Sequence, residues 1–206
     1  MKLVVLFLLV LSGVLSATVL DGKQYDKKSN EYYKVYKEEY EKLPIENKKR
    51  ILNSYYNTVT YNMGYTMAAT RFLENRGEDT RYENKKSINK NIHKDYISYD
   101  CGDYGINTMT YLRSINKISK KHKAHIEACK TLSKDKKLNL KLALDMYKYG
   151  MDVSNGNLKK SWNVYNTGNT KIINDRVYQM RGIILVLTEE IKKQKTKNIV
   201  NIAMND

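Results

Sequence analysis

The chain has 206 residues, 37 Lys and Arg against 22 Asp and Glu, and a formal net charge of +15. This charge favours an anionic partner, such as an anionic cell wall, anionic lipid or nucleic acid. The chain has a single Pro and only 10 Gly, and its apolar residues follow helical spacing over long stretches. These features favour an all-α protein over one built from sheets.

The chain begins with an apolar stretch. Lys2 is followed by LVVLFLLVLSGVL and then by Ser16 and Ala17. This is the layout of a secretory signal peptide, and the run is too short to span a bilayer, which needs about 20 residues. We therefore assign residues 1–17 to a signal peptide, with an uncleaved anchor as the alternative. The mature chain is expected to be exported, periplasmic or secreted, with no stable membrane insertion after cleavage and no nucleic-acid partner.

The first predicted helix lies in residues 18–44, an N-terminal extension that is charged and rich in Tyr. It should end before Pro44, because the residue before a proline disfavours helical geometry. A second helix is predicted from about Ile45 to Asn75, with Gly64 marking a bend or a close approach. Gly77 is suited to its left-handed cap.

One face of this second helix ends in an acid. Met63, Met67, Thr70 and Glu74 follow helical spacing and continue an apolar stripe from Ile51. A carboxyl at the end of a buried stripe loses hydration, which raises its pKa and suits it to general acid catalysis. The alternative is a solvated Glu74 at the rim of the stripe.

Residues 76–100 are polar and aperiodic, which predicts a long surface excursion. Beyond them, helical spacing predicts further helices in residues 108–118, 125–132, 138–151, 158–165 and 175–193. Residues 194–206 are predicted to form a C-terminal tail or a loose helix. We expect one domain over residues 45–193, and a monomer. His93, His122 and His125 lack the spacing of a helical metal site, so no metal and no cofactor are expected.

The two cysteines are Cys101 and Cys129. An even count in an exported chain indicates one disulfide, which would stabilise the fold by about 3–4 kcal/mol. Two separate buried thiols are the alternative.

Three blocks occur in order: AATRFLENRG, CGDYGINTMTYL and SWNVYNTGN. Together they resemble the lytic transglycosylases with an SLT domain, the goose-type-lysozyme-like family 23 of glycoside hydrolases, over about residues 45–190. The resemblance implies a lysozyme-like fold and a catalytic Glu74. The chain departs from the family pattern at Asn75, where Ser is usual, and at Gly105, where Gln is usual.

The resemblance also implies an activity, the cleavage of peptidoglycan glycan strands between N-acetylmuramic acid and N-acetylglucosamine. Glu74 would protonate the bridging oxygen and then take the proton of the muramic acid C6 hydroxyl, giving a 1,6-anhydro sugar. A tethered nucleophile of this kind needs no second carboxylate. Residues expected to bind substrate are Gly102, Tyr104, Ile106, Asn107, Tyr165, Asn166 and Tyr178.

Two alternatives stay open. The substitutions at Asn75 and Gly105 fit a non-catalytic wall-binding module on the same scaffold. A hydrolytic muramidase would need a second carboxylate, and the candidates are Asp79, Asp100 and Asp103.

Overall fold

The structure is a computed structural model that describes residues 27–84, 88–169 and 175–203, with side chains described to residue 196. The predicted signal peptide, residues 1–17, lies outside the described residues. The mainly helical class is confirmed. The elements are α2 Lys27–Lys42, α3 Ile45–Tyr56, η1 Val59–Tyr61, α4 Gly64–Asn75, β1 Asn89–Ile92, β2 Ile97–Cys101, β3 Ile106–Asn107, α5 Thr108–Ser114, α6 His122–Lys134, α7 Lys136–Val153, α8 Leu158–Thr167 and α9 Asp175–Ala203.

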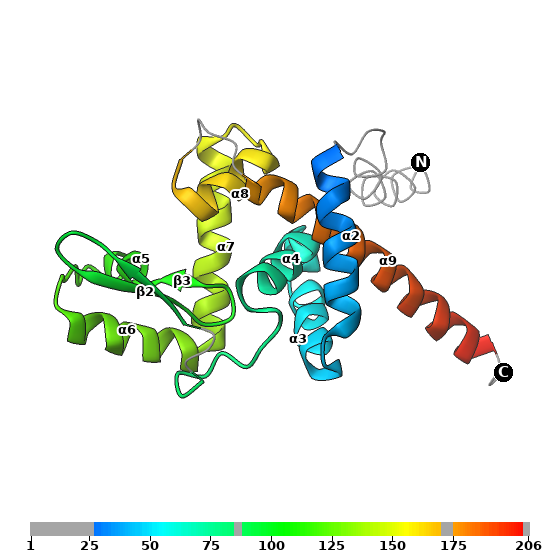
Figure 1. Ribbon diagram of the computed structural model, residues 1–206, viewed down its shortest axis with the longest axis horizontal. Helices are drawn as coiled ribbons and strands as arrows, with labels where there is room; N and C mark the ends of the chain where they lie inside the picture. The colour runs from blue at the N-terminus through cyan, green and yellow to red at the C-terminus, as the bar shows by residue number, and fades with distance from the viewer. Residues whose placement is uncertain (1–26, 85–87, 170–174, 204–206) are drawn as a thin grey trace, which may run out of the picture.

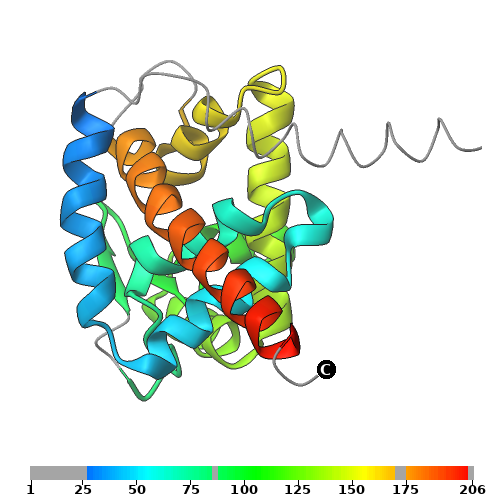
Figure 2. The same ribbon diagram turned by 90° about the vertical axis from the view of Figure 1, so that its right-hand side faces the viewer.

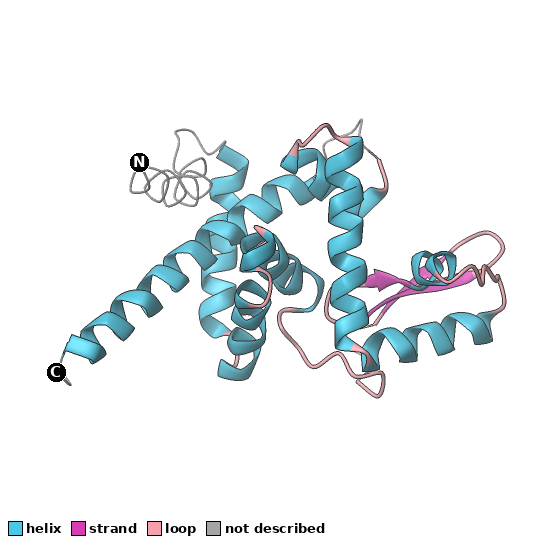
Figure 3. Cartoon of the chain, turned by 180° about the vertical axis from the view of Figure 1, so that it is seen from behind, coloured by secondary structure: helices cyan, strands magenta, loops and turns pink. Residues whose placement is uncertain are grey.

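Helix α7 stands between two groups of elements (Figures 1 and 3). On one side lie the three strands with α5 and α6, which pack on one another. On the other side lie α2, α3, α4 and α9. Helix α8 packs on both α7 and α9 and so links the central helix to the second group.

The predicted single helix over residues 45–75 is wrong, because α3 and α4 are separate. The chain between them contains Asn57, Thr58 and Val59, all weak helix formers. Asn62 adopts the left-handed conformation at φ 58°, which ends the helical path. Helix α4 restarts at Gly64, where a Cβ would press on the Tyr55 ring at 2.8 Å, so only glycine lets α4 approach α3 this closely.

Helix α9 closes the core together with α2. Its Val177, Met180, Ile184, Leu187 and Ile191, which share one face by their spacing, are all buried. Figure 2 shows α9 crossing the face turned to the viewer, with α2 alongside it. Helix α9 continues to Ala203, so of the two alternatives for the tail, residues 194–206, the structure shows a helix up to that residue.

Part of the predicted polar excursion forms an antiparallel sheet of order β1-β2-β3. In its register Asp100 on β2 lies opposite Asn89 on β1 and Asn107 on β3. Cys101 at the end of β2 forms a disulfide with Cys129 of α6, with their Cα atoms 5.4 Å apart. The disulfide ties the sheet to the helix that covers it.

Candidate active site

A cavity of about 470 Å³ lies between the end of α4, the sheet and the end of α8. Segments distant in sequence meet around it, and Met146 reaches it from α7. Its walls contain two carboxyl groups and several amides. The lining residues include Glu74, Asp100, Gly105, Asn107, Tyr165 and Asn166.

Glu74 enters the cavity from the last turn of α4. The same helix buries Met67, Ala68 and Phe72, so the core fixes the backbone that carries the acid. The Glu74 side chain is only 17 % exposed, and its Oε1 accepts a hydrogen bond from Arg176 Nη2 in the first turn of α9. Burial raises the pKa of Glu74 above its ordinary value. The Arg176 charge acts against this rise and the Asp100 charge adds to it.

The other oxygen of Glu74 faces the turn before β3. Gly105 has φ +62°, and a Cβ at this position would collide with Glu74 Oε2. Asn75, next to the acid, donates from Nδ2 to the Asp103 carbonyl at 3.0 Å and holds this turn against α4. Asn75 therefore holds the turn that contains Gly105, and the glycine leaves the space that the Glu74 carboxyl occupies.

Asp100 is the second carboxylate of the cavity, contributed by β2. Its Oδ1 accepts from Asn107 Nδ2 at 2.8 Å and its Oδ2 accepts from Asn91 Nδ2 at 2.9 Å. Asn107 also caps α5, accepting from Met109 N at 2.9 Å. The flanking strands thus fix the position of Asp100 through neutral donors.

Tyr165 forms part of the wall from α8. Its ring stacks on Tyr147 with the centroids 4.2 Å apart, and its hydroxyl donates to the Tyr104 carbonyl at 2.6 Å. Burial is the main cause that raises the pKa of Tyr165 well above its ordinary value. The Tyr165 hydroxyl holds the turn before Gly105 through this hydrogen bond, while Tyr165 also lines the cavity that contains Glu74.

The structure brings only some of the predicted binding residues to the cavity, namely Asn107, Tyr165 and Asn166 together with Glu74. Four predictions are corrected. Gly102 is packed against Asn139, and Ile106 is fully buried in the core. Tyr104 points away and donates to Ser54 Oγ at 3.1 Å. Tyr178 lies on α9 beside Lys28, whose Nζ is 5.2 Å from the ring centre.

The other candidate carboxylates are engaged elsewhere. Asp79 lies in the loop after α4 and accepts from Arg81 Nε at 2.6 Å. Asp103 pairs with the buried Arg71 at 2.5 Å and with Lys136 at 2.8 Å. Burial alone would raise the pKa of Asp103, but Arg71 and the hydrogen bonds from Lys136 and Thr80 hold it below its ordinary value. Neither of these aspartates lines the Glu74 cavity.

Arg176 and Asn91 were not predicted from the sequence, and Asn107 was predicted only as a substrate-binding residue, not as a partner of Asp100. The sequence does place Asn91 and Asn107 close to Asp100, at separations of 9 and 7 residues, which the strands of a hairpin can bring together. Nothing in the sequence indicates that Arg176 contacts Glu74, because it lies 102 residues further along the chain. The part of the chain that the structure describes contains no group of three or more metal-binding side chains and no helix apolar and long enough to cross a membrane.

Comparison with family models, with curated proteins and with solved structures finds no match to this chain.

Proposed function

We propose that this protein cleaves the glycan strands of peptidoglycan, with Glu74 as the general acid. The observation that carries the proposal is that one cavity contains two carboxyl groups, Glu74 and Asp100, whose hydrogen-bond partners differ in charge. Glu74 is buried and has a raised pKa, whereas Asp100 is bound by two neutral amides. Most glycosidases use two carboxyl groups in different environments as their catalytic residues.

The first chemical step uses the proton of Glu74. The carboxyl gives its proton to the bridging oxygen, the bond from that oxygen to C1 breaks, and positive charge develops on the sugar ring. Arg176 holds Oε1, and the missing side chain at Gly105 leaves room beside Oε2. The ring charge is stabilised by a carboxylate at the position of Asp100.

The position of Asp100 favours hydrolysis as the second step. As a base, Asp100 would take a proton from water while the water oxygen bonds to C1. As a nucleophile, Asp100 would bond to C1, and water would then replace it and give its proton to the ionised Glu74. Both routes leave a reducing end. The second candidate is the lytic transglycosylase reaction implied by the sequence blocks. There the C6 hydroxyl adds at C1, and its proton goes to the ionised Glu74.

The two reactions differ in their products and in their need for Asp100. Purified peptidoglycan is incubated with the protein, and the soluble muropeptides are analysed by mass spectrometry. We expect reducing ends, a loss of about 10²–10⁴-fold in Glu74→Gln and a loss of at least about 10²-fold in Asp100→Asn. Asp79→Asn is the matched control, since Asp79 lies outside the cavity.

Other outcomes would change the assignment. Anhydro products with Asp100→Asn still active would identify the transglycosylase. Wall binding without any soluble product from the wild type would identify a binding module and would contradict the proposed activity.

A further inference from the structure

Two adjoining cavities lie on the opposite side of α7 from Glu74. Met146 reaches the Glu74 cavity, whereas Leu140, Leu144 and Met151 project from the other side of the same helix, because residues advance by about 100° each. The larger cavity, which we call the apolar groove, has a volume of about 800 Å³. Its apolar lining consists of Tyr61, Met63, Leu140, Leu144, Met151 and Leu158.

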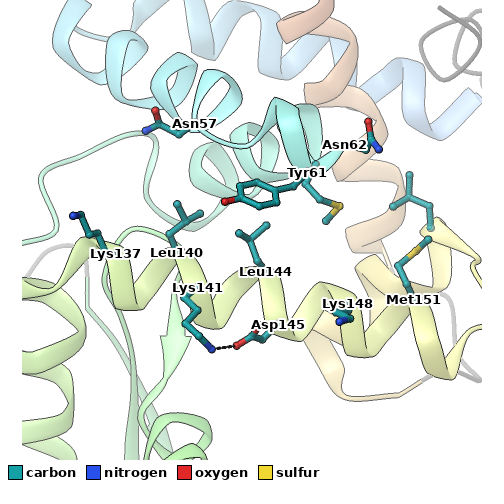
Figure 4. A pocket seen from close by; sticks show the side chains of 12 residues that line it. Asn57, Tyr61, Asn62, Lys137, Leu140, Lys141, Leu144, Asp145, Lys148 and Met151 are labelled. Atoms are coloured by element: carbon teal, nitrogen blue, oxygen red, sulfur yellow. Dashed lines mark hydrogen bonds and ion pairs between the residues drawn. The ribbon is translucent and has the colours of Figure 1, made fainter. Parts of the chain in front are cut away.

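The apolar groove runs between α7 and the η1 segment. Figure 4 shows Leu140 and Leu144 rising from α7 toward the ring of Tyr61. Tyr61 is 64 % exposed, although its ring lies over apolar side chains. Apolar side chains gathered in an open hollow of this size indicate a binding site for an apolar group.

The groove has a basic edge. Lys137, Lys141 and Lys148 follow one another along α7 beside the leucines (Figure 4). Lys141 pairs with Asp145 at 2.6 Å. Among the described residues no carboxylate pairs with Lys137 or Lys148, so this edge carries net positive charge.

A polar pocket of about 280 Å³ continues the groove at one end, and Asn57, Lys137 and Leu140 line both. It contains three cationic residues, Arg50, Lys136 and Lys137, and one acid, Asp103, which already pairs with Arg71 and Lys136. Within the described part of the chain, Arg50 donates to neutral acceptors alone, Asn47 Oδ1 at 3.2 Å and the Gly77 carbonyl at 3.3 Å. The pocket is therefore arranged to accept an anion.

We infer that the apolar groove and the polar pocket form one binding site for a single acyl chain with an anionic head, of the long-chain fatty acid class. The chain lies along α7 between Lys137 and Met151, a distance of about 21 Å at the helical rise. The carboxylate lies at Lys137 and Arg50. This site is separate from the proposed cleavage activity and does not rest on it.

Methionine methyl groups report on the two sides of α7 separately. Met63 and Met151 line the apolar groove, whereas Met109 and Met146 line the Glu74 cavity. In protein labelled with ¹³C at the methionine methyls, tetradecanoate below its micelle concentration should shift Met63 and Met151 saturably. Met109 and Met146 should not move. Each methylene removed from the chain should weaken binding about fourfold.

Two variants test the recognition of the head. Lys137→Glu should weaken tetradecanoate binding at least about tenfold, because it reverses an exposed charge at the head position. Lys123→Glu is the matched control on α6, exposed and outside both cavities, and it should bind as the wild type does. Leu144→Gln should weaken binding by acting on the groove alone.

Several results would overturn the inference. These are the absence of saturable shifts at Met63 and Met151, equal affinity for tetradecyltrimethylammonium, and equal effects of Lys137→Glu and Lys123→Glu. Occupation of the groove by an amphipathic peptide but not by tetradecanoate would also overturn it. None of these results bears on glycan cleavage, which has its own readout.

Discussion

The two sides of α7 differ in how their side chains are held. On the Glu74 side each carboxyl group is fixed by a hydrogen-bond partner, Arg176 for Glu74 and two asparagines for Asp100. On the side of the apolar groove the leucines and methionines are held by packing alone, and the charges stand at the edge. Fixed polar groups suit a reaction with one geometry, whereas flexible apolar side chains suit a ligand recognised by area and charge.

The largest effect is expected where the two sides share a wall. Asp103 lines the polar pocket, its carboxylate pairs with the buried Arg71, and its carbonyl holds Asn75 next to the acid. Asp103→Ala should lower the free energy of unfolding by about 3–5 kcal/mol, because it leaves the Arg71 charge buried without compensation. Urea unfolding at neutral pH measures the loss.

Asp145→Ala is the control for this prediction. It removes the acid of an exposed pair on the groove side, Lys141–Asp145, and should cost at most about 0.5 kcal/mol. Similar losses of stability in the two variants would contradict the prediction that Asp103 compensates the buried charge of Arg71.

A smaller effect is expected at Gly105, which bears on the Glu74 side alone. Gly105→Ala should lower the free energy of unfolding by about 1–3 kcal/mol, through its positive φ and the collision with Glu74. Cleavage activity should fall further, and tetradecanoate binding should not change. Gly156→Ala has a comparable φ of +75° with nothing near its Cβ position, so it measures the backbone contribution alone. Equal losses in the two variants would mean that the contact between the new Cβ at position 105 and Glu74 contributes nothing to the loss of stability.

The smallest effect concerns the pH dependence of stability. Since burial raises the pKa of Glu74, the folded protein gains stability from this group below its unfolded pKa, near 4.5, and loses it as the pH rises through the folded pKa. Glu74→Gln should remove this loss, a gain of about 1.4 kcal/mol for each unit by which the pKa is raised. Urea unfolding from pH 4 to pH 8 would follow it.

The control for this measurement is Glu127→Gln, which changes an exposed glutamate of α6 outside the Glu74 cavity and should alter the free energy of unfolding by at most about 0.5 kcal/mol. A Glu74→Gln variant that became less stable than the wild type as the pH rose would mean that Arg176 dominates and that the pKa of Glu74 is lowered instead.

Helical spacing located most helices from the sequence, because each helix buries one apolar face. It could not locate the sheet, because β2 buries the polar Ser98 while Ile97 is only partly buried. The alternation of buried apolar and exposed polar residues that marks a strand is therefore missing. The break between α3 and α4 was lost for a related reason, since the apolar spacing continues through Val59 although this side chain is 42 % exposed.

The candidate site was only partly predictable. Glu74 could be found because the stripe of α4 leads to it. Tyr104 was placed in the site from a motif that does not encode side-chain direction, and the structure turns it toward Ser54 instead. The partner of Glu74 comes from Arg176, and nothing local in either stretch indicates that they meet.

The late position of Arg176 in the chain has a consequence for biosynthesis. The protein is made from its N-terminus, so α4 leaves the ribosome well before α9 exists. Until α9 is made, the Glu74 carboxyl has no guanidinium partner, and the core lacks Val177, Met180 and Leu187. A nascent or truncated product without α9 lacks these core residues and the partner of the proposed acid, so activity would wait until α9 has been made.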